Sequence, residues 1–94
     1  MFTQERTESV LRRLAAQFFQ NISSASLLTV TSCRLSSDGK RATIFVSVLP
    51  EEEGPATYEY AKRRLSEFQE YVREHVRIHS VPFFEISLAK EGEK

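Results

Sequence analysis

The sequence predicts an α+β domain, in the order α-β-β-α(α)-β, in which helices cover one face of a three-stranded sheet. Two stretches typical of β-structure flank Asp38-Gly39, amphipathic helical patterns lie on either side of them, and a short strand pattern comes late in the chain. Ninety-four residues suffice for one modest hydrophobic core. We therefore expect residues 1–94 to form a single domain, with a frayed end over about residues 90–94.

The first element is a helix from about Thr3 to Asn21. Val10, Leu14 and Phe18 recur at every fourth position, which places their side chains on one face of a helix. Polar residues from Asn21 onward predict the end of this helix.

Two strands follow, over residues 27–35 and 40–49. Every second residue of the latter stretch is apolar and is expected to face the core: Ala42, Ile44, Val46 and Val48. Asp38-Gly39 between the strands is a strong hairpin signal, because glycine readily adopts the positive φ that tight turns need. The sequence therefore predicts an antiparallel hairpin.

A long helix is predicted after the acidic loop at 51–53. From Pro55 to about His79 the apolar residues keep a spacing of three or four, with no glycine or proline inside. This spacing favours a straight helix that ends before Pro82.

Residues 83–88 predict the last strand, with Phe84, Ile86 and Leu88 toward the core. Because a long helix precedes it, this strand is expected to return parallel to one of the first two.

The composition excludes several classes of function. Thirteen Lys and Arg balance thirteen Asp and Glu, so binding to nucleic acid has to rest on local clusters of charge. Cys33 is the only cysteine, which excludes an internal disulfide and a cysteine-based zinc site. His75 and His79 have a metal-binding spacing but no visible third ligand. We expect no metal, no cofactor, no small-molecule substrate and no enzymatic activity, and the absence of a long apolar run or a secretory pattern indicates a cytoplasmic protein without membrane contact.

Two stretches and their order resemble the ribosome-binding factor A family, whose fold is KH-like with type II topology. One is the hairpin, whose second strand reads Ala42-Thr43-Ile44-Phe45-Val46-Ser47. The other runs from Arg77 to Ile86, through Pro82 at the entry to the last strand. The resemblance covers nearly the whole chain. It implies a bacterial, monomeric, non-enzymatic factor for ribosome biogenesis and rRNA processing, which binds the immature small ribosomal subunit through its ribosomal RNA and assists late maturation.

One position departs from that family. Its members usually have Ala-x-Gly where the helical segment kinks, and this chain has Arg64-Leu65-Ser66. Serine lacks the conformational freedom of glycine, so we expect a straighter helix here.

The candidate RNA-binding residues are basic or polar positions on the long helix and at the hairpin. They are Lys62, Arg63, Arg64, Ser66, Arg73, Arg77, Lys40 and Arg41, with Arg12 and Arg13 as weaker candidates. On a continuous helix, Lys62, Ser66, Arg73 and Arg77 would form one row. The alternative is a solvated helix surface with local ion pairs such as Glu70–Arg73. Likewise, Tyr58, Tyr60 and Tyr71 either stack on bases or pack at the edge of the core.

A second function stays open. Neutral charge, the missing glycine and the Phe-rich strands also suit a protein–protein interaction module with little RNA binding, homodimeric through an exposed strand edge. The salt dependence of binding distinguishes the two functions, because only phosphate-driven binding weakens steeply as salt rises.

Overall fold

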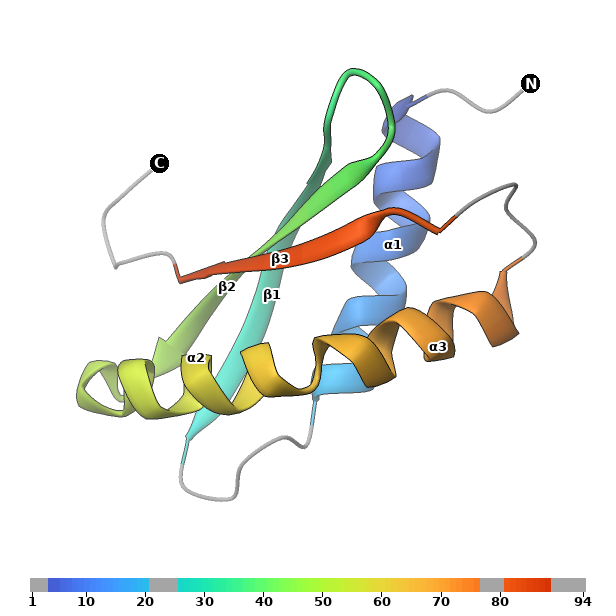
Figure 1. Ribbon diagram of the computed structural model, residues 1–94. Helices are drawn as coiled ribbons and strands as arrows, with labels where there is room; N and C mark the ends of the chain where they lie inside the picture. Colours follow the sequence, from blue (N-terminus) through green and yellow to red (C-terminus); the bar gives the residue numbers. More distant parts are fainter. Residues whose placement is uncertain (1–3, 21–25, 77–80, 89–94) are drawn as a thin grey trace.

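The computed structural model describes residues 4–20, 26–76 and 81–88 (Figure 1). Its elements are α1 (Gln4–Phe19), β1 (Leu27–Leu35), β2 (Arg41–Leu49), the 3-10 turn η1 (Glu51–Glu53), α2 (Gly54–Arg63), α3 (Leu65–His75) and β3 (Phe83–Leu88). This α-β-β-α-α-β order confirms the predicted fold class.

The three strands form one mixed sheet in the order β1-β2-β3. β1 and β2 are antiparallel, whereas β3 returns parallel to β2, as predicted (Figure 1). Ala42 lies beside Phe84, and the pairing continues in register to Val46 beside Leu88. A bulge at Thr31 interrupts the β1–β2 register, and the Thr31 hydroxyl donates a hydrogen bond to the Phe45 carbonyl at 3.0 Å.

The hairpin turn forms where the sequence predicts it. Gly39 has a φ of 74°, and its N–H donates a 2.9 Å hydrogen bond to the Ser36 carbonyl. The Asp38 carboxylate accepts hydrogen bonds from the Ser36 hydroxyl at 2.6 Å and the Lys40 N–H at 3.0 Å. Because both bonds favour the charged form, they lower the pKa of Asp38.

The core lies between the helices and one face of the sheet. Alternate strand residues point into it: Ala42, Ile44, Val46, Val48, Phe84 and Ile86 are buried, as predicted, and Leu88 packs at the margin. The helices contribute Leu11, Phe19, Phe68 and Val72 from α1 and α3. Cys33 is also a buried core residue. The opposite face of the sheet bears the exposed side chain of Phe83.

A polar contact fastens α1 to the end of β1. The Glu8 carboxylate accepts a 2.6 Å hydrogen bond from the backbone N–H of Leu35. Burial, with a smaller contribution from the Glu8 charge, raises the pKa of the nearby Cys33 thiol to about 12. The thiol is therefore held in its neutral form at physiological pH.

The helical segment is split, as the predicted α(α) order allows, although its apolar spacing favours a straighter helix. Arg64, with φ −96° and ψ 5°, separates α2 from α3, and its N–H bonds to the Ala61 carbonyl at 2.9 Å. This three-residue bond tightens the last turn of α2 and so ends its α-helical ladder. The two helices can then take different directions, so α2 lies over the far end of β3 and α3 reaches α1 (Figure 1).

The helix also ends earlier than its apolar spacing suggests. Val76 is extended, with φ −138° and ψ 136°, so α3 stops at His75 and the predicted end near His79 is wrong. Arg77 and His79 lie outside the described residues.

Candidate nucleic-acid interface

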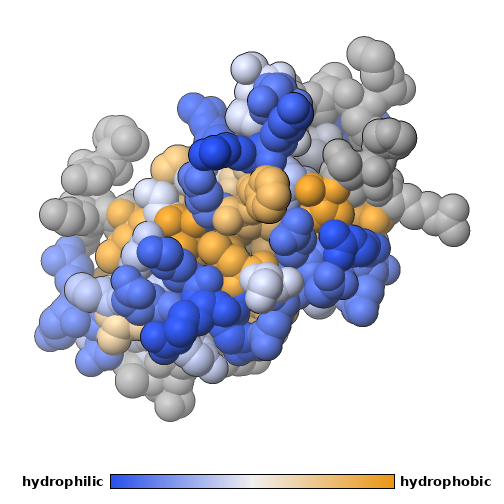
Figure 2. Space-filling model, in the orientation of Figure 1, coloured by the Kyte–Doolittle hydropathy of each residue, from blue (hydrophilic) through white to orange (hydrophobic). Residues whose placement is uncertain are grey.

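A shallow groove runs between the α2–α3 junction and β3. It has a volume of about 310 Å³ and is lined by Tyr58, Lys62, Leu65, Phe84, Glu85 and Ile86. Figure 2 shows apolar side chains gathered across the centre of this face, with hydrophilic margins on both sides. The groove thus combines an apolar floor with charged rims, which suits the ribose and base edges of a strand whose phosphates lie outside.

Lys62 supplies the positive charge on the helical rim. Its Nζ lies 5.8 Å from the centre of the Tyr58 ring, and the side chain is exposed. At this exposure the cation–π attraction is weak, so the ammonium group is available to a phosphate.

The opposite rim is formed by Glu85 of β3. Its carboxylate pairs with Arg41 of β2 at 3.3 Å, and both side chains are exposed. Parallel pairing of β2 with β3 therefore brings Arg41, predicted from the hairpin, beside the groove. The pair partly neutralises the one carboxylate among the lining residues, which would otherwise repel phosphate.

Arg63 and Arg64 lie at the junction itself but differ in their contacts. Arg64 forms an ion pair with Glu67, donates a 3.5 Å hydrogen bond to the Tyr60 hydroxyl and lies over the Phe18 ring. The bonds to Glu67 and Tyr60 raise the pKa of its guanidinium. Arg63 is exposed, with its guanidinium carbon 6.0 Å from the Tyr60 ring centre. Lys62 and Arg63 are thus better placed than Arg64 to receive phosphate.

The other predicted residues are dispersed. Ser66 is exposed in the first turn of α3, Arg73 is paired with Glu70, and Lys40 is exposed in the hairpin turn. Because Arg64 interrupts the helix, the predicted row from Lys62 through Ser66 and Arg73 does not continue on one helical surface. The structure therefore brings Lys62 and the Arg41–Glu85 pair to one groove, but not the whole predicted set.

The tyrosines are mostly used within the protein. Tyr71 packs against the rings of Phe18 and His75, with centres 5.2 and 4.1 Å away, and its hydroxyl donates to the Gln17 side chain. His75 donates its Nδ1–H to the Tyr71 carbonyl at 2.8 Å. Tyr58 remains half-buried in the groove wall, as the tyrosine best placed to meet a base.

The described ranges 4–20, 26–76 and 81–88 contain neither a metal-binding cluster nor a membrane-spanning helix. No group of three or more His, Cys, Asp or Glu residues there could hold a metal ion. No helix in this part of the chain has the length and apolar character needed to cross a membrane.

Several groove residues were missed by the sequence analysis. Leu65, Phe84 and Ile86 read as core positions in the sequence, and Glu85 read as an ordinary strand residue. Their common role depends on the parallel return of β3 beside β2, which brings residues distant in sequence to one groove.

An interrupted helix pair bordering a groove against a parallel edge strand defines a KH-like domain of type II topology. No protein-family model matches the sequence, and a search of curated proteins finds no match. The fold nevertheless has clear relatives among solved structures. It is that of ribosome-binding factor A.

The crystal structure of ribosome-binding factor A from Thermus thermophilus is similar, with a TM-score of 0.79 and 26% identity over 93% of this chain and 97% of that one. A homology model of the Thermus protein, fitted into a cryo-electron-microscopy map of its 30S complex, gives a TM-score of 0.76 and 26% identity over 92% and 94% of the two chains. The solution structure of a Thermotoga maritima protein, provisionally assigned as a ribosome-binding factor A, gives 0.68 and 22% over 97% and 87%. The family resemblance predicted from the sequence is thereby confirmed at the level of the fold.

Proposed function

We propose that this protein is a non-enzymatic ribosome-assembly factor, which binds the immature small ribosomal subunit through its ribosomal RNA and assists late maturation. The observation that carries the proposal is the groove beside the α2–α3 junction, with Lys62 in its lining and the exposed Arg63 next to it in the chain, in a protein with the ribosome-binding factor A fold. The fitted model of the Thermus protein in a 30S complex supports the same partner.

The local chemistry of the groove compensates for the neutral charge of the whole chain. Lys62 and Arg63 would hold phosphates, while Leu65 and Ile86 provide apolar contact area next to them. Binding alone shifts the RNA toward the conformation that fits the groove, so the function needs no cofactor. It would place the protein in the cytoplasm, acting as a monomer on the subunit.

The test is sedimentation of the tagged protein through a gradient of bacterial lysate. Wild type is expected with free small subunits and absent from full ribosomes. The double variant Lys62→Gln/Arg63→Gln should lose about tenfold in affinity for purified small subunits at low salt, because two phosphate contacts are removed. A wild-type protein that stays at the top of the gradient would contradict the proposal.

A matched control separates local contacts from overall charge. Arg34→Glu changes the net charge by −2, as does the double variant, at an exposed position of β1 away from the groove. It should retain affinity within about twofold. Equal losses in the two variants would indicate a general charge effect and argue against the groove as the contact.

One observation favours a second candidate, the protein-interaction module. Leu27 and Leu49, paired across β1 and β2, are 59% and 55% exposed, and Phe83 on β3 is 72% exposed. Such apolar side chains suit a protein partner or a second copy of the chain. Dimers in sedimentation equilibrium, together with subunit binding that does not change with salt, would favour this candidate over RNA binding.

A further inference from the structure

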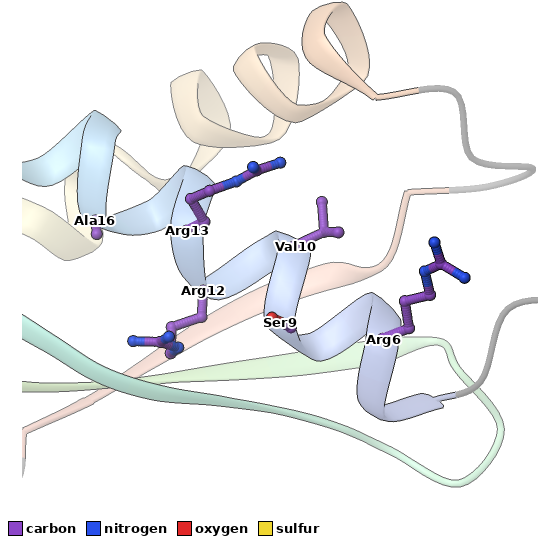
Figure 3. Close-up of a pocket in the computed structure, with 6 residues that line it drawn as sticks. All are labelled: Arg6, Ser9, Val10, Arg12, Arg13 and Ala16. Atoms are coloured by element: carbon purple, nitrogen blue, oxygen red, sulfur yellow. The ribbon is translucent and has the colours of Figure 1, made fainter.

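The outer face of α1 carries a second basic hollow. It has a volume of about 430 Å³ and is lined by Arg6, Ser9, Val10, Arg12, Arg13 and Ala16. Figure 3 shows Arg6, Val10 and Arg13 extending to the same side of the helix, while Arg12 extends to another side. The lining thus contains three arginine side chains beside two small apolar residues, Val10 and Ala16.

No carboxylate is among the described residues that line this hollow. Glu8, in the same helix, binds the Leu35 N–H toward β1 and is not in the lining. Arg12 and Arg13 are exposed, and neither forms an ion pair with another side chain in the described part of the structure. In a chain of zero formal net charge, this face is a strong local concentration of positive charge.

The hollow is separate from the groove at the α2–α3 junction, and the two share no lining residue. α1 packs along β1 and meets α3 through Phe18 and Phe19 in its last turn, whereas Arg6 to Arg13 lie further toward its start. In Figure 1, α1 stands on the right, and α2 with the end of β3 lies on the left.

We propose that this face of α1 is a second RNA-backbone site, so that the protein holds two segments of RNA at once. The inference rests on the proposed function for its first site. An arginine guanidinium group can bind two phosphate oxygens at once. The small apolar residues of the hollow would contact ribose without distinguishing one base from another. The exposed Arg12 and Arg13 are the two guanidinium groups offered to phosphate, and they extend to different sides of α1.

Two sites on one rigid domain act differently from one larger site. Once the groove has bound its segment, a second segment of the same RNA meets the α1 face at a high effective concentration. The protein thus favours RNA conformations in which the two segments lie a molecular width apart. An acidic protein would also be attracted to this face, and the test below separates it from RNA.

The experiment is an NMR titration of the full chain with a short single-stranded oligouridine RNA. In wild type, amide signals of residues 9–16 and of residues 58–66 should both shift. In Arg12→Gln/Arg13→Gln the shifts over 9–16 should be lost while those over 58–66 persist, and in Lys62→Gln/Arg63→Gln the reverse should hold. The slope of log K against log salt should fall by about 1.4 in each double variant, because each single-strand phosphate contact contributes about 0.7. Arg34→Glu, with the same net charge change, should keep both sets of shifts.

Each failure points to a different conclusion. Unshifted 9–16 signals in wild type, with 58–66 shifting, would overturn the second site and leave the proposed function standing. No shift in either region, with no subunit binding, would overturn both. If Arg12→Gln/Arg13→Gln weakens binding to small subunits but not to the RNA, the face binds a protein and the inference is wrong. Glutamine retains helix propensity at both exposed positions, and thermal melts by circular dichroism check that the variants are folded.

Discussion

The guanidinium carbon of Arg64 lies 5.4 Å from the centre of the Phe18 ring. This contact joins the α2–α3 junction to the last turn of α1, and the Glu67 ion pair fixes the same guanidinium from α3. Arg64 thus contacts both neighbouring helices at the interruption between α2 and α3.

Arg64→Ala should therefore destabilise the fold more than Arg63→Ala. The loss for Arg64 is expected to be about 1 kcal/mol, from one partly exposed cation–π contact and one exposed ion pair. Among the described residues Arg63 makes only a long contact with the Tyr60 ring, and its loss should stay within about 0.5 kcal/mol. Urea denaturation measures both. If the two alanine variants unfold at the same urea concentration, Arg64 has no special role at the junction.

Phe68 and Phe83 offer a matched pair for testing the position of the core. Phe68 is fully buried among Phe18, Phe19 and Phe84, while Phe83 is 72% exposed on the other face of the sheet. Phe68→Ala should cost about 3–5 kcal/mol, and Phe83→Ala no more than about 0.5 kcal/mol. Chemical denaturation gives both values. Comparable losses would mean that the two faces of the sheet are assigned wrongly.

Gly39→Ala tests the conformation of the hairpin turn. A Cβ at Gly39 would meet no atom within 4 Å, so the cost comes from its φ of 74° alone. We expect a loss of about 1 kcal/mol, and a smaller loss for Gly39→Asn, because asparagine tolerates this region better. Ser37→Ala in the same turn is the control and should be nearly neutral. Thermal melts that place alanine and asparagine at the same stability would contradict the positive φ.

The Cys33 thiol should make stability fall at high pH. Its pKa is about 12 in the fold and about 9.0 in the unfolded chain, so the unfolded chain loses its proton first. Stability is therefore unaffected below about pH 9 and decreases by about 1.4 kcal/mol per pH unit between these two values. Urea unfolding of wild type and Cys33→Ala at about pH 8, 9 and 10 isolates the effect, since other titrations cancel in the difference. Parallel losses in the two proteins would show that Cys33 does not titrate this way.

The local parts of the fold could be predicted from the sequence. Asp38-Gly39 specified the turn, and the period of two in β2 identified the buried face. A split of the long helix could be allowed for but not placed at Arg64, because the apolar spacing resumes after a single non-helical residue. What holds that residue is Phe18, which is remote in sequence and becomes a neighbour only when α1 packs against α3.

The candidate site, like the fold, could be predicted only in its local features. A run of three basic residues predicts the Lys62–Arg64 cluster. No sequence pattern predicts that Arg64 is paired with Glu67 while Lys62 lines a groove. The pairing of Arg41 with Glu85 depends on the parallel register of β2 and β3, which is a tertiary property. The sequence thus predicts which residues of the site are charged, but not which of those charges are available to bind a phosphate.

The acidic turn η1 and the basic face of α1 together give the molecule an uneven distribution of charge. Glu51, Glu52 and Glu53 lie at the start of α2, on the side of the molecule away from α1 (Figure 1). A polyanion exerts little net attraction on a chain of zero net charge, but it exerts a torque on separated charges of opposite sign. As the protein approaches the RNA, this torque would orient the arginines of α1 toward the RNA and the glutamates of η1 away from it. The protein would then be partly oriented for binding before it makes contact.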